Sequence, residues 1–195
     1  MSTTQITISD CYNGFIEELF TEEFQKNLAA VHSEFQLKRK TLLERRTLKS
    51  DLSHDESMGP TWVQTMSGYK NIISEEQKII CLRELSLNER NLCINGQAVC
   101  AGLLDLFTAA FHTKNRKTTL TFYVPKCESS LEAKWWNDLI NSVQKLLKME
   151  KGILNISFLF ETKSETKGMD NLIDLGLPKT NIPHFSDESI WDKVI

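Results

Sequence analysis

The hydrophobic pattern is clearest beyond the middle of the chain, where two apolar runs flank a long amphipathic segment. Residues 118–124 and 153–160 are rich in β-branched and aromatic side chains, which is typical of buried strands. In residues 130–147 between them, apolar positions recur at steps of three and four, which predicts a helix with one buried stripe. Two strands joined by a long helix are expected to be parallel, with a right-handed crossover.

The ends of this helix carry recognisable signals. Ser129 followed by Glu132 has the form of a capping box, and Gly152 is expected to end the helix. The buried stripe is predicted to consist of Leu131, Trp135, Trp136, Leu139, Ile140, Val143, Leu146 and Leu147. Adjacent residues of a helix point about 100° apart, so Trp135 and Trp136 are both buried only if the helix is covered broadly.

A second long helix is predicted over residues 21–46, again from apolar residues at helical steps. Thr21 is its candidate N-cap. The basic residues at 38–40 and 45–46 suit the later turns of a helix dipole and are expected on a solvated face. Residues 1–13 are polar and are expected to be loose.

Three shorter signals lie between these helices and strands. Residues 78–82 form an apolar run that predicts a strand, and Asn95-Gly96 is a strong turn signal between two short apolar runs. Residues 101–111 are apolar and long enough for a buried helix. Residues 164–195 contain scattered glycines and prolines and predict loops with short helical turns.

Charged residues are predicted to meet at one edge of the sheet. Lys126 and Glu128 follow one strand, Glu161 ends the next, and Arg83 follows the strand at 78–82. The carboxyl ends of parallel strands share an edge, and ligands of α/β proteins bind there. Cations and carboxylates at that edge suit a metal or an anionic substrate, and solvated loop charges are the alternative interpretation.

The overall composition excludes some classes of binding partner. The 195 residues include 23 basic and 26 acidic side chains, and a net charge of −3 argues against nucleic acid as the main partner. No apolar run approaches the ~18 residues of a membrane span. The first residues lack the layout of a secretory signal. The five cysteines are scattered without a CxxC pair, which argues against a zinc site or a disulfide framework.

Several segments of the chain resemble the malate synthase family. PKCESSLEAKWWND resembles the P-K-x-E-S-x-x-E-A-x-x-W-N-D segment of malate synthases, and FLFET resembles their L-I-E-T strand end. Residues 19–46 are similar to their leading helix, with its H-R-R-F-x-x-R-R-x-x-L-L-x-x-R pattern. Weaker similarities, in the same order as in the family, lie at residues 56–62, 95–99 and 103–112.

The resemblance implies an α/β fold in which an N-terminal helical clasp precedes a TIM-type (β/α) barrel. We expect a clasp-like region at residues 1–50, a partial barrel at 51–163 and a divergent tail at 164–195. A complete barrel takes about 250 residues, and three predicted strands cannot close one. The barrel is therefore expected to be incomplete.

The chemistry implied by the resemblance is the condensation of acetyl-CoA with glyoxylate, which gives malate and CoA. Glu161 matches a carboxylate that binds Mg²⁺ in the family. Arg83 matches an arginine that binds glyoxylate and stabilises the enolate, although Glu84 beside it is expected to weaken its charge. Lys126 and Glu128 match the family motif as candidate substrate-binding residues, and a structural ion pair is the alternative.

Two features of the family pattern are missing from the sequence. The motif that carries the second metal carboxylate does not occur, and neither does the motif of the catalytic aspartate. Asp55 and Glu56 stand where the family has an acidic pair, but no apolar strand precedes them, so they are expected to be surface charges. For Arg83, a structural salt bridge is the competing interpretation.

Two functions therefore stay open: an acyltransferase of the malate synthase type, or a non-catalytic protein that keeps part of the fold for packing or association. A fragment that does not fold alone is a further alternative. The resemblance implies a peroxisomal or glyoxysomal location and the composition allows a cytoplasmic one, while the last residues are not an SKL tail. The sequence defines no oligomeric state.

Overall fold

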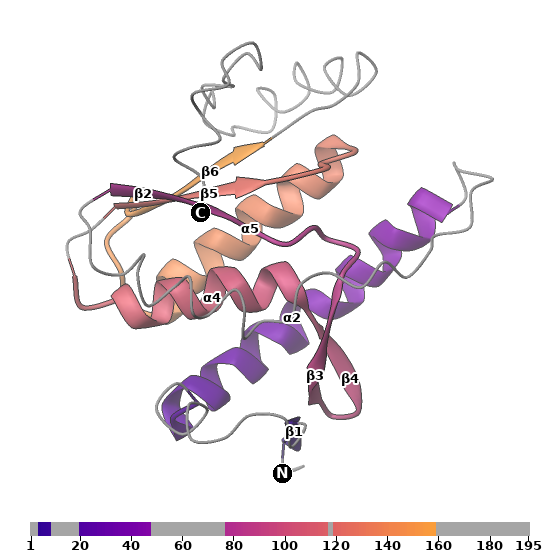
Figure 1. The fold of residues 1–195 in the computed structure, drawn as a ribbon, viewed down its shortest axis with the longest axis horizontal. Coiled ribbons are helices and arrows are strands. Elements are labelled where there is room, and N and C mark those ends of the chain that lie inside the picture. Colours follow the sequence, from indigo (N-terminus) through magenta and orange to yellow (C-terminus); the bar gives the residue numbers. More distant parts are fainter. Residues whose placement is uncertain (1–3, 9–19, 48–76, 117–118, 159–195) are drawn as a thin grey trace.

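The computed structural model describes residues 4–8, 20–47, 77–116 and 119–158 (Figure 1). Its elements, in chain order, are β1 (Ile6–Ile8), α2 (Glu22–Thr47), β2 (Gln77–Cys81), β3 (Asn88–Ile94), β4 (Gln97–Cys100), α4 (Ala101–Thr113), β5 (Thr119–Val124), α5 (Ser130–Leu146) and β6 (Leu154–Phe158). This mixture of helices and two small sheets confirms the expected α/β class. None of the described helices is both long and apolar enough to cross a membrane.

The parallel sheet has the strand order β2-β5-β6. Cys81 of β2 stands opposite Tyr123 of β5, and Val124 of β5 stands opposite Phe158 of β6. The predicted parallel strand–helix–strand unit is therefore confirmed, and its strand ends share one edge. Along β5 every second side chain is buried, so one face of the sheet packs on the core while the other carries more polar side chains.

Helix α5 is covered from two sides, as its adjacent tryptophans require. Trp135 donates a hydrogen bond from Nε1 to the carbonyl oxygen of Phe35 on α2, at 3.2 Å. Trp136 is fully buried and lies beside Gly102 of α4. Two members of the predicted stripe, Leu131 and Leu146, are 44% and 37% exposed. Including them was wrong, because these two side chains, in the first and last turns of α5, remain partly exposed to solvent.

The carboxyl end of α5 differs from the prediction. The helix ends at Leu146, and Lys148 rather than Gly152 takes the left-handed position after it, with φ of 54°. The N–H group of Met149 donates to the carbonyl of Gln144 at 2.9 Å, which completes a Schellman motif. Gly152, with φ of 90°, lies in the turn that leads to β6.

The second sheet is antiparallel, with the order β1-β3-β4. The predicted turn is confirmed, because Asn95 and Gly96 both have positive φ, as a type I′ hairpin requires. Ile6 pairs with Ile94 of β3. The expectation of a loose N-terminus is wrong for residues 6–8, where Ile6 and Ile8 pack against the hydrophobic core.

Helix α2 confirms its predicted cap and stripe. The N–H group of Phe24 donates to Oγ1 of Thr21 at 3.2 Å. The buried residues of the stripe are Phe24, Leu28, Val31 and Phe35. The expectation that all its basic residues are solvated is wrong, because Arg39 and Arg46 are buried. Both guanidinium groups bind segments that follow strands of the parallel sheet, as described below.

Candidate functional site

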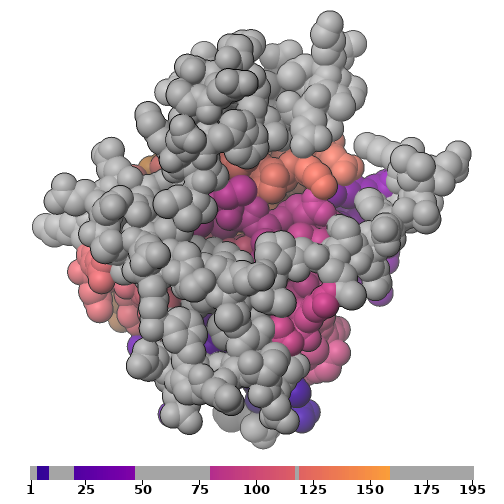
Figure 2. Space-filling model, viewed as in Figure 1, coloured from indigo at the N-terminus to yellow at the C-terminus, as the bar shows by residue number. Residues whose placement is uncertain are grey.

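Charged side chains meet at the carboxyl edge of the parallel sheet. Lys126 follows β5, and its Nζ lies 3.0 Å from Oε2 of Glu84, which follows β2. Glu128 lies 3.1 Å through Oε1 from Nη1 of Arg46, at the end of α2. In Figure 2 magenta atoms from the part of the chain around β2 lie beside orange atoms from the part around β5 and α5, with violet atoms of α2 next to them. The predicted edge therefore brings Lys126 and Glu128 together with two groups from other elements.

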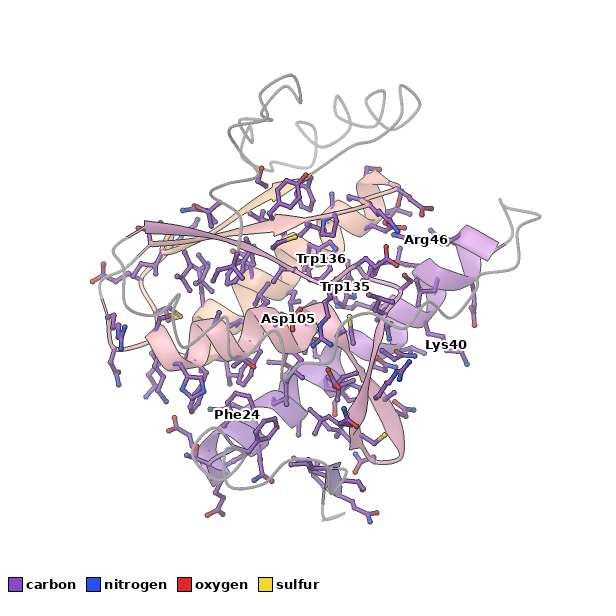
Figure 3. The ribbon with its side chains drawn as sticks, in the orientation of Figure 1. Phe24, Lys40, Arg46, Asp105, Trp135 and Trp136 are labelled. Carbon is purple, nitrogen blue, oxygen red and sulfur yellow. The ribbon has the colours of Figure 1, made fainter. Side chains whose placement is uncertain are left out.

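Arg46 makes the most extensive contacts in this group. Its Nε and Nη2 donate to the two carboxylate oxygens of Glu132, each at 2.7 Å, and Nη2 also donates to the carbonyl oxygen of Lys126 at 3.0 Å. Burial lowers the pKa of Arg46, but Glu132, Glu128 and Glu84 outweigh that effect and raise it. Figure 3 shows Arg46 at the end of α2 beside the start of α5.

The local sequence explains why this segment turns as it does. Proline cannot continue the hydrogen-bond ladder, so Pro125 ends β5. Ser129 then caps α5 by accepting a hydrogen bond from the N–H group of Glu132, at 3.3 Å. The carboxylate of Glu132 reaches back to the N–H group of Glu128 at 2.9 Å, one residue earlier than in a regular capping box. The first turn of α5 and the preceding loop are therefore held together by one carboxylate.

Glu84 does not pair with Arg83, as the sequence suggested, but with Lys126 and Ser86. Burial raises the pKa of Glu84, yet its hydrogen bonds to Ser86 and Lys126 and the nearby cations lower it overall. Lys126 is more than half exposed in this pair, whereas Glu84 is mostly buried. The amino group is thus the part of the pair that solvent or a ligand can reach.

Arg83 lies below this surface in a separate ion pair. Its Nη2 is 2.7 Å from Oδ1 of Asp105 on α4, and its Nη1 is 2.7 Å from Oε2 of Glu89 on β3. The backbone N–H group of Arg83 also donates to Asp105, at 3.0 Å. Only 8% of its side chain is exposed. Burial alone would lower the pKa of Arg83, but the two carboxylates raise it. The predicted salt bridge is therefore present, with partners that the sequence did not indicate, and the role of Arg83 toward glyoxylate stays a prediction.

The described residues include no large cluster of metal-ligand side chains. No group of three or more His, Cys, Asp or Glu side chains in the described ranges could hold a metal ion. The carboxylates of Glu84 and Glu128 each bind a cationic side chain instead. Glu161, Asp55 and Glu56 lie outside the described residues, so the predicted metal ligand is not placed.

Sequence reasoning missed several buried charged residues, of which Arg46 contacts the site and the others lie near it. Arg39 and Arg46 were assigned to a solvated face, although they match two arginines of the H-R-R-F-x-x-R-R-x-x-L-L-x-x-R pattern. Asp105 is the only charged residue in an otherwise apolar helical run, which is a signal of a buried ion pair. Glu89 is buried between two exposed residues of β3, and no sequence signal distinguishes it from a solvent-exposed glutamate.

Parallel strand–helix–strand units are characteristic of α/β proteins, which bind their ligands at the carboxyl edge of the sheet. The charged groups of this chain lie at that edge. A family model described as the TIM barrel domain of malate synthase matches residues 78–176, just over half of the chain. The chain therefore belongs to the malate synthase family.

Individual relatives agree with this assignment. The chain is 30% identical to the malate synthase of Dictyostelium discoideum over 139 residues, which cover 58% of this chain and 26% of that protein. It is 32% identical to a glyoxysomal malate synthase of Candida tropicalis over 100 residues, covering 49% and 18%. It is 25% identical to malate synthase A of Escherichia coli over 146 residues, covering 61% and 27%. The chain thus matches between 18% and 27% of the length of these relatives.

Proposed function

We propose that the chain acts as an acyltransferase of the malate synthase type, which condenses acetyl-CoA with glyoxylate to give malate and CoA. The single observation that carries this proposal is the edge formed by the ends of β2 and β5, in a chain of this family. Lys126 and Glu128 follow β5 there and come from the segment that most resembles the family. Their side chains are 57% and 43% exposed, so both remain accessible to an anionic substrate or its magnesium complex.

In the proposed architecture, α2 belongs to an N-terminal clasp at residues 1–50 and the parallel strands belong to an incomplete barrel at 51–163. This arrangement is supported by the packing of α2 on α5, on the side away from the sheet (Figure 1). Residues 164–195 form the proposed divergent tail. The three strands β2, β5 and β6 would be one arc of the barrel wall.

The proposed chemistry assigns roles to this chain's own groups. A bound magnesium ion would polarise the glyoxylate carbonyl and support the developing negative charge, and Glu161 is its proposed ligand. Lys126 would attract anionic substrate groups, and Glu128 would orient the same segment. No residue is assigned as the base that removes the methyl proton of acetyl-CoA.

One observation favours the second candidate function, a non-catalytic member of the family. Arg83, the proposed glyoxylate ligand, is buried between Asp105 and Glu89, so its guanidinium already binds two carboxyl groups of the chain. An anionic substrate would have to displace at least one of them. Displacing a buried partner is costly, since breaking a buried ion pair typically costs about 3–5 kcal/mol.

The test is glyoxylate-dependent release of thiol from acetyl-CoA by the purified chain in the presence of magnesium. Glu161→Ala should abolish the release, and Glu150→Ala, which removes an exposed carboxylate, is the matched control. Glyoxylate-dependent release lost only in Glu161→Ala supports the acyltransferase. No release from a chain that melts cooperatively overturns it in favour of the non-catalytic alternative.

Magnesium titration separates the two candidates without turnover. Binding of the ion that Glu161→Ala removes and Glu150→Ala retains would support a catalytic metal site. The same weak binding in all three proteins would argue against the site, because non-specific surface binding does not depend on one carboxylate.

The variant Arg83→Lys tests the role of Arg83 in the same thiol-release assay. Lysine lacks the planar fork of the guanidinium, so the KM for glyoxylate should rise if Arg83 binds glyoxylate.

A further inference from the structure

The loop that carries Lys126 and Glu128 has an unfavourable backbone conformation. Lys126 has φ of 49°, in the left-handed region that residues with a side chain seldom adopt. Such conformations persist only where surrounding contacts fix them, and they are concentrated at functional sites. The contacts that fix this loop therefore decide where its two charged side chains lie.

Two of the contacts of this loop come from Arg46, which precedes Lys126 by 80 positions. Arg46 binds the carbonyl oxygen of Lys126 itself and the carboxylate of Glu128. It also forms the paired hydrogen bonds to Glu132, and Glu132 in turn accepts from the N–H group of Glu128. The guanidinium thus contacts both sides of the turn between β5 and α5.

These contacts need the shape of arginine. The planar guanidinium presents several donors in a fixed fork, whereas a lysine ammonium is a single point charge on a flexible chain. Lysine at position 46 could keep one contact to Glu132 but could not bind that carboxylate in a paired manner and also reach the carbonyl of Lys126. Arg46→Lys therefore keeps the positive charge and removes the paired hydrogen bonds to Glu132 together with the contact to Lys126.

We infer that Arg46 is a positioning residue of the carboxyl-edge site, which holds the Lys126–Glu128 segment in its left-handed turn and so makes helix α2 part of that site. The link to catalysis rests on the proposed function. The positioning itself is a structural claim about the loop, and it can be decided whether or not the chain turns over substrate.

The chain supplies its own matched control and two internal reporters. Arg39 is a second buried arginine of α2, and it binds the segment after β2 through the carbonyl oxygens of Leu85, Ser86 and Leu87. The thiol of Cys100 is fully buried against the carbonyl of Leu85, while the thiol of Cys127 is buried within the Lys126–Glu128 loop. Cys127 therefore lies in the loop that Arg46 binds, whereas Cys100, the last residue of β4, contacts the carbonyl of Leu85 that Arg39 also binds.

The experiment measures the alkylation rates of Cys127 and Cys100 in the folded full chain, by peptide-resolved mass spectrometry. In Arg46→Lys we expect the rate at Cys127 to rise about tenfold or more relative to Cys100, because local opening of the loop exposes it. In Arg39→Lys the ratio should change in the opposite direction. Equal increases at both thiols in Arg46→Lys, or no increase at Cys127, would overturn the inference, because the arginine would then act on global stability or on neither segment.

Kinetics tests the link to catalysis separately. If the wild-type chain releases thiol, Arg46→Lys should raise the KM for acetyl-CoA or glyoxylate about tenfold, and Arg39→Lys should change it much less. An unchanged KM alongside faster Cys127 alkylation would overturn the link to the site and leave Arg46 a loop contact. A wild-type chain without activity would refute the proposed function, and the alkylation ratio would still decide the positioning claim.

Discussion

The backbone of Gly102 on α4 lies directly against the carbonyl oxygen of Arg83. A Cβ atom added at Gly102 would be 2.2 Å from that oxygen and 2.8 Å from Cη2 of Trp136. In an ordinary helix Gly→Ala is stabilising by up to ~1 kcal/mol. Here the added methyl group must displace backbone and a buried ring, so we expect Gly102→Ala to destabilise the chain by about 1–3 kcal/mol or more. A urea denaturation midpoint equal to or above that of the wild type would contradict this close contact.

The ion pair of Arg83 gives a second prediction. Arg83→Met removes the only described cation that contacts Asp105 and Glu89 and leaves two buried carboxylates without it. We expect a loss of about 3–5 kcal/mol in the free energy of unfolding, measured in urea. The matched control is Lys134→Met, which removes the partner of Asp138 from a half-exposed helical pair. Lys134→Met should change the free energy of unfolding by no more than about 0.5 kcal/mol. Equal losses in the two variants would show that burial of the Arg83 ion pair does not make it more important for stability.

The fold could be predicted from the sequence wherever periodicity and local signals agreed. The parallel unit around α5, the Asn95-Gly96 hairpin and the stripe of α2 all follow from local patterns, and all are confirmed. The end of α5 could not be predicted, because the chain uses Lys148 in a position where glycine is far commoner. Strand β1 could not be predicted either, because three residues form it only by pairing with β3.

The site was predictable only in part, because charge partners are set by tertiary contacts. Topology alone placed Lys126 and Glu128 at the carboxyl edge. Their partners Glu84 and Arg46 come from other elements, and no local pattern joins them. Basic residues on a long helix are usually solvated, so burial of Arg46 depends on the carboxylates that α5 and its preceding loop present to it.

Buried histidines predict a loss of stability under mildly acidic conditions. Within the described residues, neither ring nitrogen of His32 has a hydrogen-bond partner, and Nε2 of His112 also lacks one. Burial lowers the pKa of both side chains, and the nearby Arg39 and Lys114 lower it further. Near pH 6.5 these two side chains therefore bind protons more readily in the unfolded chain than in the folded one. Their contribution lowers the stability of the folded chain as the pH drops through that value.

The measurement is the urea midpoint at pH 7.5, 6.5 and 5.5, for the wild type and for a variant with His32→Leu and His112→Leu. The wild-type midpoint should decline over this range, and the decline should be smaller in the variant, because the remaining histidines contribute to both proteins alike. An identical decline in the two proteins would show that these side chains are not the cause.

Lys148 offers the opposite kind of prediction, a substitution that stabilises. Its φ of 54° places a side chain in the left-handed region directly after α5. Glycine adopts this conformation without the clash of Cβ, although it gives the unfolded chain more freedom, so we expect Lys148→Gly to stabilise the chain by about 0.5–1 kcal/mol. The control is Lys145→Gly, which lies inside the last turn of the helix and should destabilise it by about 1 kcal/mol. If both glycines lower the urea midpoint, α5 does not end where the Schellman motif places it. If Lys148→Gly raises the urea midpoint and Lys145→Gly lowers it, the helix ends at Leu146. Only a residue that follows the helix in the left-handed conformation is stabilised by replacement with glycine.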